Sequence, residues 1–259
     1  ISIGLVGSEM CIRDRSTTPL RPPAMTDRRL PNDVPPPATP LTVRRVFTVW
    51  WPLAGSWLLM GVEMPMLTMA MTRMPGGDPH LAAIGSLVYP LSILIEAPII
   101  MLLAASTALV KDLATHARLL RFAHGASALL TIAHVAVAFT PLFDWVVLDV
   151  IGAPVETLEP GRTGMQLMTP WTWAIGYRRF QQGVLIRCGR SDLVGVGTII
   201  RLAANLTVLA TGLIVGSWPG IVVGTCAISC GVLAEAAWAG WCFRSVSYTH
   251  LRAHETDRY

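Results

Sequence analysis

The sequence predicts an all-α, polytopic membrane protein built as a bundle of six transmembrane helices. Of its 259 residues, 53% are hydrophobic and only 14% are charged, whereas a soluble domain carries about 25% charged residues. Apolar runs of about 20 residues, long enough to cross a bilayer as helices, recur along the chain. Basic residues concentrate in alternate connections between these runs, a pattern typical of chains that cross a membrane several times.

Both ends of the chain are assigned to translated adapter rather than to protein. Residues 1–16 can be encoded by DNA whose reverse complement encodes residues 244–259. Such an inverted repeat resembles a transposon-type sequencing adapter read on both sides of an insert, so neither end enters the functional reasoning. We expect residues 17–45 to form a disordered, Pro- and Arg-rich cytoplasmic tail, and residues 46–243 to form the six-helix transmembrane lobe.

The six helices are predicted from apolar length and flanking charges. The first helix opens with Trp50 and Trp51, which are typical of a membrane interface. Between the third and fourth helices, an acidic segment at 141–163 is expected to include a short surface helix around 143–151. The predicted spans are 46–71, 82–110, 117–140, 164–187, 193–216 and 219–243.

The second helix carries a carboxylate inside the apolar run LSILIEAPIIMLLAASTALV, residues 91–110. Glu96 lies near the middle of this run, where a charge costs at least about 2.5 kcal/mol on insertion scales and is normally paired or functional. Pro98 cannot donate a hydrogen bond to the carbonyl of Leu94, which predicts a kink. This helix is therefore expected to have one polar side.

The distribution of basic residues predicts the topology. The tail and the loops after the second and fourth helices carry most of them, while the opposite loops carry most of the acids. The positive-inside rule then places both ends of the insert in the cytoplasm of a multi-pass protein of the cell membrane. The residues on the predicted cytoplasmic side are Arg21, Arg28, Arg29, Arg44, Arg45, Lys111, Arg118, Arg121, Arg187 and Arg190, against Arg73 and Arg162 outside.

Ionisable residues at membrane depth are the candidate functional residues, and two interpretations are open. Their charges can pair across helices and fix the helix register, or some of them can line a water-filled cavity. Glu63, Glu96 and Glu235 are candidates for ion coupling, because a carboxylate held in a low dielectric can exchange a proton. Arg178, Arg179, Gln182, Arg201 and Asn205 are candidates for a substrate cavity.

Helical spacing arranges these cavity candidates in two groups. Thr198, Arg201 and Asn205 form a polar stripe on the fifth helix. On the fourth helix Arg178 and Gln182 share a face, while Arg179 points about 100° away. A guanidinium group is suited to carboxylate or phosphate, so several at depth indicate an anionic substrate or a lipid headgroup.

Other chemistry lacks support in the sequence. There is no phosphate-binding loop, no HExxH and no GxSxG, so we expect no enzyme activity, no metal and no cofactor beyond H⁺ or Na⁺ as a coupling ion. The lone His116, His124 and His134 are interpreted as interfacial or packed residues rather than ligands. No nucleic acid is expected as a partner.

Two long runs resemble the MOP flippase superfamily, which includes the MATE multidrug exporters, the polysaccharide and lipid-linked flippases and the progressive ankylosis (ANK)-like transporters. The runs are HLAAIGSLVYPLSILIEAPIIMLLAASTALVKD at 80–112 and YRRFQQGVLIRCGRSDLVGVGTIIRLAANL at 177–206, and the WPL opening at 51–53 fits as well. The likeness spans about 46–243 and is closest to the ANK-like and MATE-like bacterial members.

The resemblance implies twelve helices in two lobes of six, with alternating access around a central cavity. This chain would then be the N-terminal lobe, and its partners would be the lipid bilayer, the missing C-terminal lobe and a small-molecule or lipid-linked anionic substrate. The implied function is H⁺- or Na⁺-coupled efflux or flipping of an anionic or amphipathic solute. By the same resemblance Glu63 or Glu96 would couple protons, and Arg178, Arg179 and Arg201 would face the substrate.

One alternative from a different class stays open. The chain could be a membrane structural or assembly subunit whose buried charges are only ion-paired.

Overall fold

A computed structural model describes residues 42–250, and within this range the chain consists of helices joined by turns and loops, with no strand. The all-α class is therefore confirmed for the described part. The predicted adapter at 1–16, the predicted tail as far as residue 41 and the last part of the second adapter, 251–259, lie outside the described residues.

Helix α1 spans Val43–Met71, so the end of the predicted tail is already helical. It contains Pro52 and Pro65, which cannot donate backbone hydrogen bonds. The hydroxyl of Ser56 donates to the carbonyl of Pro52 at 2.8 Å, as serines often do one turn along a helix. The helix is followed by a turn in which Gly76 has a φ of 92°, a left-handed conformation that favours glycine.

The second predicted helix is divided into four consecutive helical pieces. They are α2 (Gly77–Ala83), the π-helix η1 (Ile84–Val88), α3 (Tyr89–Ile100) and α4 (Leu102–Leu109). Two prolines explain the irregularity, because each removes one i→i−4 hydrogen bond and crowds the preceding turn. Pro90 follows the π-helix, whereas α3 continues through Leu94 and Pro98 without a break, and a turn follows at Met101.

The third predicted helix forms as expected. α5 spans Leu113–Phe139 and begins with a capping box, in which the backbone N–H of Thr115 donates to Oδ1 of Asp112 at 2.7 Å. The predicted surface helix is present as α6 (Leu142–Asp144) followed by the π-helix η2 (Trp145–Ile151).

The fourth predicted helix is broken in two and starts earlier than expected. After the 3₁₀ turn η3 (Val155–Thr157), α7 spans Leu158–Leu167 and α8 spans Thr169–Arg187. The break falls next to Pro170, which occupies the first turn of α8, where its missing N–H costs nothing.

Two long helices complete the chain. α9 spans Ser191–Val215, and α10 spans Gly220–His250, so α10 continues into residues assigned to the adapter. Within the described residues five helical segments are long and apolar enough to cross a membrane: Val46–Met71, Gly77–Leu109, Leu113–Phe139, Ser191–Val215 and Gly220–Ser245. The short, polar α8 is not among them. This pattern is compatible with a multi-pass membrane protein.

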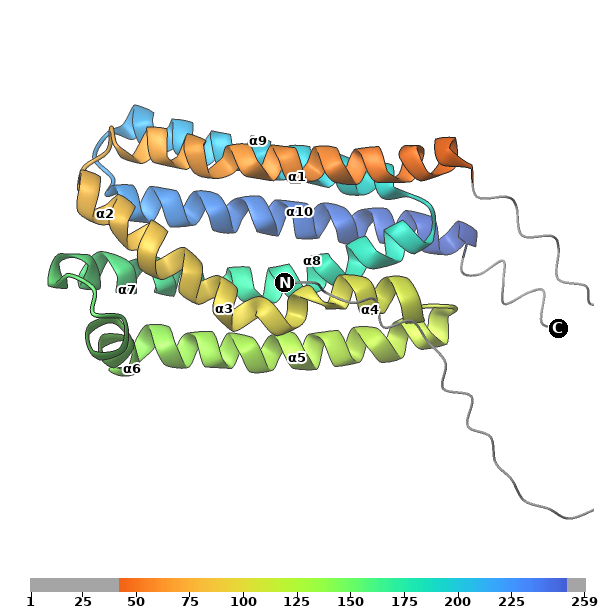
Figure 1. Ribbon diagram of the computed structural model, residues 1–259, viewed down its shortest axis with the longest axis horizontal. Helices are drawn as coiled ribbons and strands as arrows, with labels where there is room; N and C mark the ends of the chain where they lie inside the picture. The colour runs from red at the N-terminus through yellow and green to blue at the C-terminus, as the bar shows by residue number, and fades with distance from the viewer. Residues whose placement is uncertain (1–41, 251–259) are drawn as a thin grey trace, which may run out of the picture. The chain divides into compact units, whose positions relative to one another are not determined.

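The helices from α1 to α10 pack side by side (Figure 1). α1 lies against α9, and both contact α10, which in turn packs on α8. On the other side of α8 lie α3, α4 and α5. The polar α8 is therefore covered by more apolar helices, which explains how it can be buried despite its low hydropathy.

One glycine permits a close approach between α8 and α4. A Cβ atom at Gly183 of α8 would overlap the hydroxyl of Ser106 and the carbonyl oxygen of Leu103, both on α4. The hydroxyl of Thr107 on α4 also donates to the carbonyl of Gly183 at 3.1 Å. The absence of a side chain at this position therefore sets how closely α3 and α4, together called the α3–α4 arm (Tyr89–Leu109), can lie against α8.

Candidate functional site

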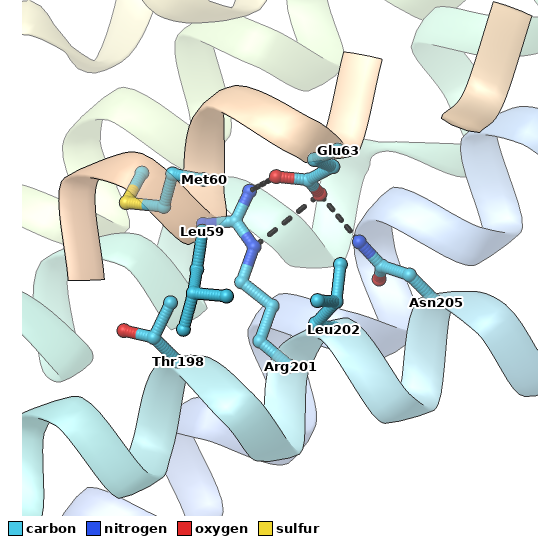
Figure 2. A pocket seen from close by; sticks show the side chains of 7 residues that line it. All are labelled: Leu59, Met60, Glu63, Thr198, Arg201, Leu202 and Asn205. Atoms are coloured by element: carbon cyan, nitrogen blue, oxygen red, sulfur yellow. Dashed lines mark hydrogen bonds and ion pairs between the residues drawn. The ribbon is translucent and has the colours of Figure 1, made fainter. Parts of the chain in front are cut away.

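Glu63 of α1 faces α9 and is bound there by two side chains (Figure 2). Arg201 donates from Nη2 to Glu63 Oε2 at 2.5 Å and from Nε to Oε1 at 3.3 Å, in the two-pronged geometry that suits guanidinium and carboxylate. Asn205, one turn along α9, donates from Nδ2 to Glu63 Oε1 at 2.5 Å. Both carboxylate oxygens of Glu63 are therefore occupied.

Glu235 of α10 is bound in the same way from α8. Arg178 donates from Nη1 to Glu235 Oε2, and Gln182 donates from Nε2 to Oε1 at 2.9 Å. The side chains of Arg178 and Glu235 are each only 1% exposed. The arrangement follows from helix geometry, because residues 178 and 182 are one turn apart on the face of α8 that meets α10.

Arg201 connects the two pairs. Its Nη1 lies 3.8 Å from Glu235 Oε2, close enough for an ion pair, while its other nitrogens bind Glu63. Two carboxylates and two guanidinium groups thus form one buried, electrically balanced network, which we call the four-helix network (Glu63, Arg178, Arg201 and Glu235). It joins α1, α8, α9 and α10, and mutual pairing offsets part of the cost of burying four charges.

A glycine makes room for this network on α10. A Cβ atom at Gly231 would overlap the side-chain oxygen of Asn205 and come within 3.1 Å of Arg201 Cγ. The two polar side chains of α9 can therefore lie directly against the backbone of α10.

The space beside Glu63 is filled by the side chains themselves. The hollow there is lined by Leu59, Met60, Glu63, Thr198, Arg201, Leu202 and Asn205, and it is too narrow to admit a water molecule. The predicted polar stripe of Thr198, Arg201 and Asn205 does share one buried face of α9 (Figure 2). In this conformation the stripe faces a carboxylate rather than an open cavity.

Glu96 of α3 is buried but belongs to neither pair. It is 4% exposed, and within residues 42–250 its Oε2 has no hydrogen-bond partner and its carboxylate forms no ion pair. The guanidinium groups of Arg178, Arg179 and Arg201 are near enough to act on it electrostatically. A buried carboxylate in a positive field without a bonded partner differs chemically from Glu63 and Glu235.

Several other buried polar atoms on α8 and its neighbours also lack partners among the described residues. Such atoms are costly unless water or a ligand binds them. They include Nε of Arg178, Nε of Arg179, Oε1 of Gln181, Oε1 of Gln182 and Oδ1 of Asn205. With Oε2 of Glu96 they supply both donors and acceptors to the interior.

The structure thus divides the predicted site residues into two groups. The network and its neutral ligands contain Glu63, Glu235, Arg178, Arg201, Gln182 and Asn205, and Glu96 and Arg179 stand outside it. Arg178 and Gln182 share a face and both bind Glu235, as helical spacing predicts, and Arg179 takes no part. Gln181 was missed, although it belongs to the same polar run, YRRFQQG at 177–183.

Two of the three histidines, His116 and His134, are buried. His134 is fully buried, with Nε2 2.9 Å from the carbonyl oxygen of Met165 and Nδ1 2.8 Å from the hydroxyl of Thr172. A neutral ring that donates to Met165 and accepts from Thr172 satisfies both nitrogens. His116 stacks on Phe243 with ring centroids 4.3 Å apart.

Within the described range no group of three or more His, Cys, Asp or Glu side chains gathers to hold a metal ion. Comparisons with protein-family models, with curated proteins and with solved structures find no match to this chain. The resemblance to the MOP superfamily therefore stays a prediction, and the chemistry of the site has to be argued from its own residues.

Proposed function

We propose that this chain is a six-helix lobe of a secondary active transporter or flippase of the MOP, MATE-like type. It would move an anionic or amphipathic solute out of the cell in exchange for H⁺ or Na⁺. In this proposal α8 is the sixth crossing, sheltered by α4, α5 and α10. The chain lies in the cell membrane with both ends of the insert in the cytoplasm.

The proposed orientation rests on charges that gather at opposite ends of the helices. At one end Arg187 donates to the carbonyl oxygens of Thr107 and Ala108 at 2.8 and 3.2 Å, next to Lys111. At the other end Arg162 pairs with Asp144 in the acidic α5–α7 connection. The more basic end is the cytoplasmic one by the positive-inside rule.

The observation that carries the coupling role is the contrast among three buried glutamates. Protonating Glu63 or Glu235 would break an ion pair and leave a guanidinium group buried without its partner, which is strongly unfavourable. Protonating Glu96 breaks no bond within the described residues. Glu96 is therefore the proposed coupling carboxylate, and the paired glutamates are proposed to hold the helices around it.

The substrate class follows from the unused guanidinium donors. Nε of Arg178 and Nε of Arg179 lack hydrogen-bond partners within residues 42–250. The nearby carboxylate of Glu96 can lose its negative charge by protonation without breaking an ion pair among these residues. An anionic group entering this region would meet two donors and, once Glu96 is protonated, no carboxylate that lacks an ion-pair partner. Proton uptake and anion binding would thereby favour one another.

Infrared difference spectroscopy of the reconstituted chain tests the coupling role. A pH step should produce the carbonyl band of a protonated carboxyl group in the native protein, and Glu96→Gln should remove that band. The matched control is Glu159→Gln, because Glu159 is an exposed acid in the first turn of α7. If the band persists in Glu96→Gln but disappears in Glu63→Gln, then Glu63, and not Glu96, is the carboxyl group that takes up the proton, and the proposed coupling role is wrong.

Transport itself is tested in vesicles that contain the product of the full gene. A proton gradient should drive uptake or release of a fluorescent anionic amphiphile, and Glu96→Gln and Arg179→Ala should each abolish the gradient dependence. Flux that is unaffected by both substitutions would refute the proposed residue roles.

The four-helix network also favours a second candidate function, a membrane structural or assembly subunit. In that case all buried charges serve only to fix helix register. Replacing Glu96 alone would then destabilise the fold as strongly as breaking a pair, and the pH-dependent carboxyl band would be absent from the native protein.

A further inference from the structure

A groove on another side of α8 has no part in the proposed transport site. Its volume is about 510 Å³, within the range of pockets that bind small molecules. It lies between α5, α8 and α10 and is lined by His124, Pro170, Trp173, Ala174, Tyr177, Leu233, Ala236 and Ala237. The charged residues of the four-helix network do not line it.

The groove opens on a surface that is apolar. Leu129 of α5 and Leu233 of α10 are 67% and 42% exposed, as expected of helices that face lipid. Trp173 on its wall is 40% exposed. A molecule that enters this groove therefore comes from the hydrocarbon of the bilayer and has to be soluble there.

Three aromatic rings form one wall of the groove. The ring of His124 on α5 stacks on Trp173 with centroids 5.3 Å apart and on Tyr177 with centroids 5.9 Å apart. The interplanar angles are 27° and 16°, so the His124 ring stacks on both of the other rings. Because Trp173 is partly exposed, a further flat ring can stack on this wall without displacing it.

Two polar groups interrupt this otherwise apolar wall. Among residues 42–250, neither the ring nitrogens of His124 nor the hydroxyl of Tyr177 has a hydrogen-bond partner. His124 lies near the middle of the 27-residue helix α5, and Tyr177 near the middle of the 19-residue helix α8. In the proposed membrane arrangement these groups face hydrocarbon rather than water, so each favours a partner that brings its own hydrogen-bonding group.

We propose that this groove is a second binding site, for a flat, bilayer-soluble ring compound that carries a hydroxyl or similar hydrogen-bonding group. The ring stacks against Trp173, and the polar group bonds to Tyr177 or His124. An acyl chain of an ordinary lipid fills the groove less well, because it leaves both polar groups unpaired and has no flat face.

Binding of 2-naphthol and of naphthalene to the protein in lipid nanodiscs tests this proposal. The two probes have the same ring system and differ by one hydroxyl group. Equilibrium dialysis against protein nanodiscs, with the partitioning into empty nanodiscs subtracted, should show one saturable site per chain. That site should prefer 2-naphthol by about fivefold, the worth of one net hydrogen bond.

Two substitutions should remove the preference without closing the groove. In the double variant His124→Phe/Tyr177→Phe the affinity for 2-naphthol should fall to that for naphthalene, while naphthalene binds as it does to the native protein. Unchanged naphthalene binding also shows that the variant is folded. Trp173→Ala should weaken both probes.

The matched control is His116→Phe, because His116 stacks on Phe243 and does not line the groove. It should bind both probes like the native protein. The absence of a saturable site, or equal affinity for the two probes in the native protein, would overturn the proposal. Equal loss of binding in His116→Phe and the double variant would do the same. None of these outcomes bears on Glu96, so the groove and the transport site are tested separately.

Discussion

Glu235 of α10 and Glu96 of α3 are buried to a similar degree, at 1% and 4% exposure, but their surroundings differ. Glu235 binds Arg178 and Gln182 and lies 3.8 Å from Arg201, whereas Oε2 of Glu96 has no partner among the described residues. A carboxylate held by three side chains from two other helices fixes those helices in place. A carboxylate without a bonded partner can gain or lose a proton without breaking a contact.

The two regions also belong to different parts of the packing. The four-helix network joins α1, α8, α9 and α10, and Glu96 lies on the α3–α4 arm, which contacts α8 and α5. This arm is irregular, with a turn at Met101, and a π-helix at Ile84–Val88 directly precedes it. Irregular helices of this kind often mark functional segments. The comparison therefore separates a part held by ion pairs from an arm that carries the one buried acid without an ion pair among the described residues.

Breaking the ion pair between Arg178 and Glu235 should have the largest effect on stability. Arg178→Met leaves the buried charge of Glu235 without its principal partner and should lower the free energy of unfolding by about 3–5 kcal/mol. Denaturant unfolding in detergent micelles, followed by circular dichroism, measures the loss. The double variant Arg178→Met/Glu235→Gln should recover part of the lost free energy of unfolding. If Arg178→Met alone is as stable as the native protein, the ion pair does not stabilise the packing of α8 on α10.

Breaking the pair between Glu63 and Arg201 should lower the stability less, because replacing glutamate with glutamine keeps the shape of the side chain. Glu63→Gln retains one acceptor oxygen for Arg201 or Asn205 but loses the charge, so we expect a loss of about 1.5–3 kcal/mol, the worth of a charge-assisted hydrogen bond. The same unfolding measurement applies. A loss larger than that of Arg178→Met would reverse the assigned order of the two pairs.

A substitution that displaces α3 and α4 from α8 tests the packing of the region that carries Glu96. Gly183→Ala would place a Cβ atom against Ser106 and the carbonyl of Leu103, so the arm has to shift, at a cost of about 1–3 kcal/mol. Ser106→Ala in the same protein should relieve part of that cost. If Gly183→Ala alone is as stable as the native protein in thermal unfolding, the arm is not held at this contact.

The smallest effect is expected at Glu96. Glu96→Gln breaks no hydrogen bond or ion pair within the described residues, so the free energy of unfolding should change by less than about 1 kcal/mol. The unfolding curves of the native protein should depend on pH, and those of this variant should depend on it less. A loss that equals that of Glu63→Gln would mean that Glu96 has a bonded partner after all.

The long apolar helices could be predicted from the sequence because length and hydropathy decide them. The predicted spans 117–140 and 193–216 correspond to α5 at Leu113–Phe139 and α9 at Ser191–Val215. The division of the second span could not be predicted, because a proline marks a missing donor but does not fix how the helix register adjusts. The separate α7 likewise depends on packing.

The ion-pair partners of the buried charges could not be predicted from the sequence. Helical spacing places Arg178 and Gln182 on one face and Arg179 on another, which the bonds to Glu235 follow. It does not say which helix meets that face, since this depends on contacts between residues far apart in the chain. For the same reason Glu63 and Glu96, similar in sequence context, could not be distinguished until their neighbours were known.

The polarity of α8 has a consequence for how the protein enters its membrane. Arg178 and its neighbours are too hydrophilic to leave the translocation channel for lipid on their own. The carboxylate that neutralises Arg178 is synthesised 57 residues later, on α10. As the sixth crossing proposed above, α8 should therefore enter the bilayer only after α10 has been synthesised, and we expect the two helices to be released together.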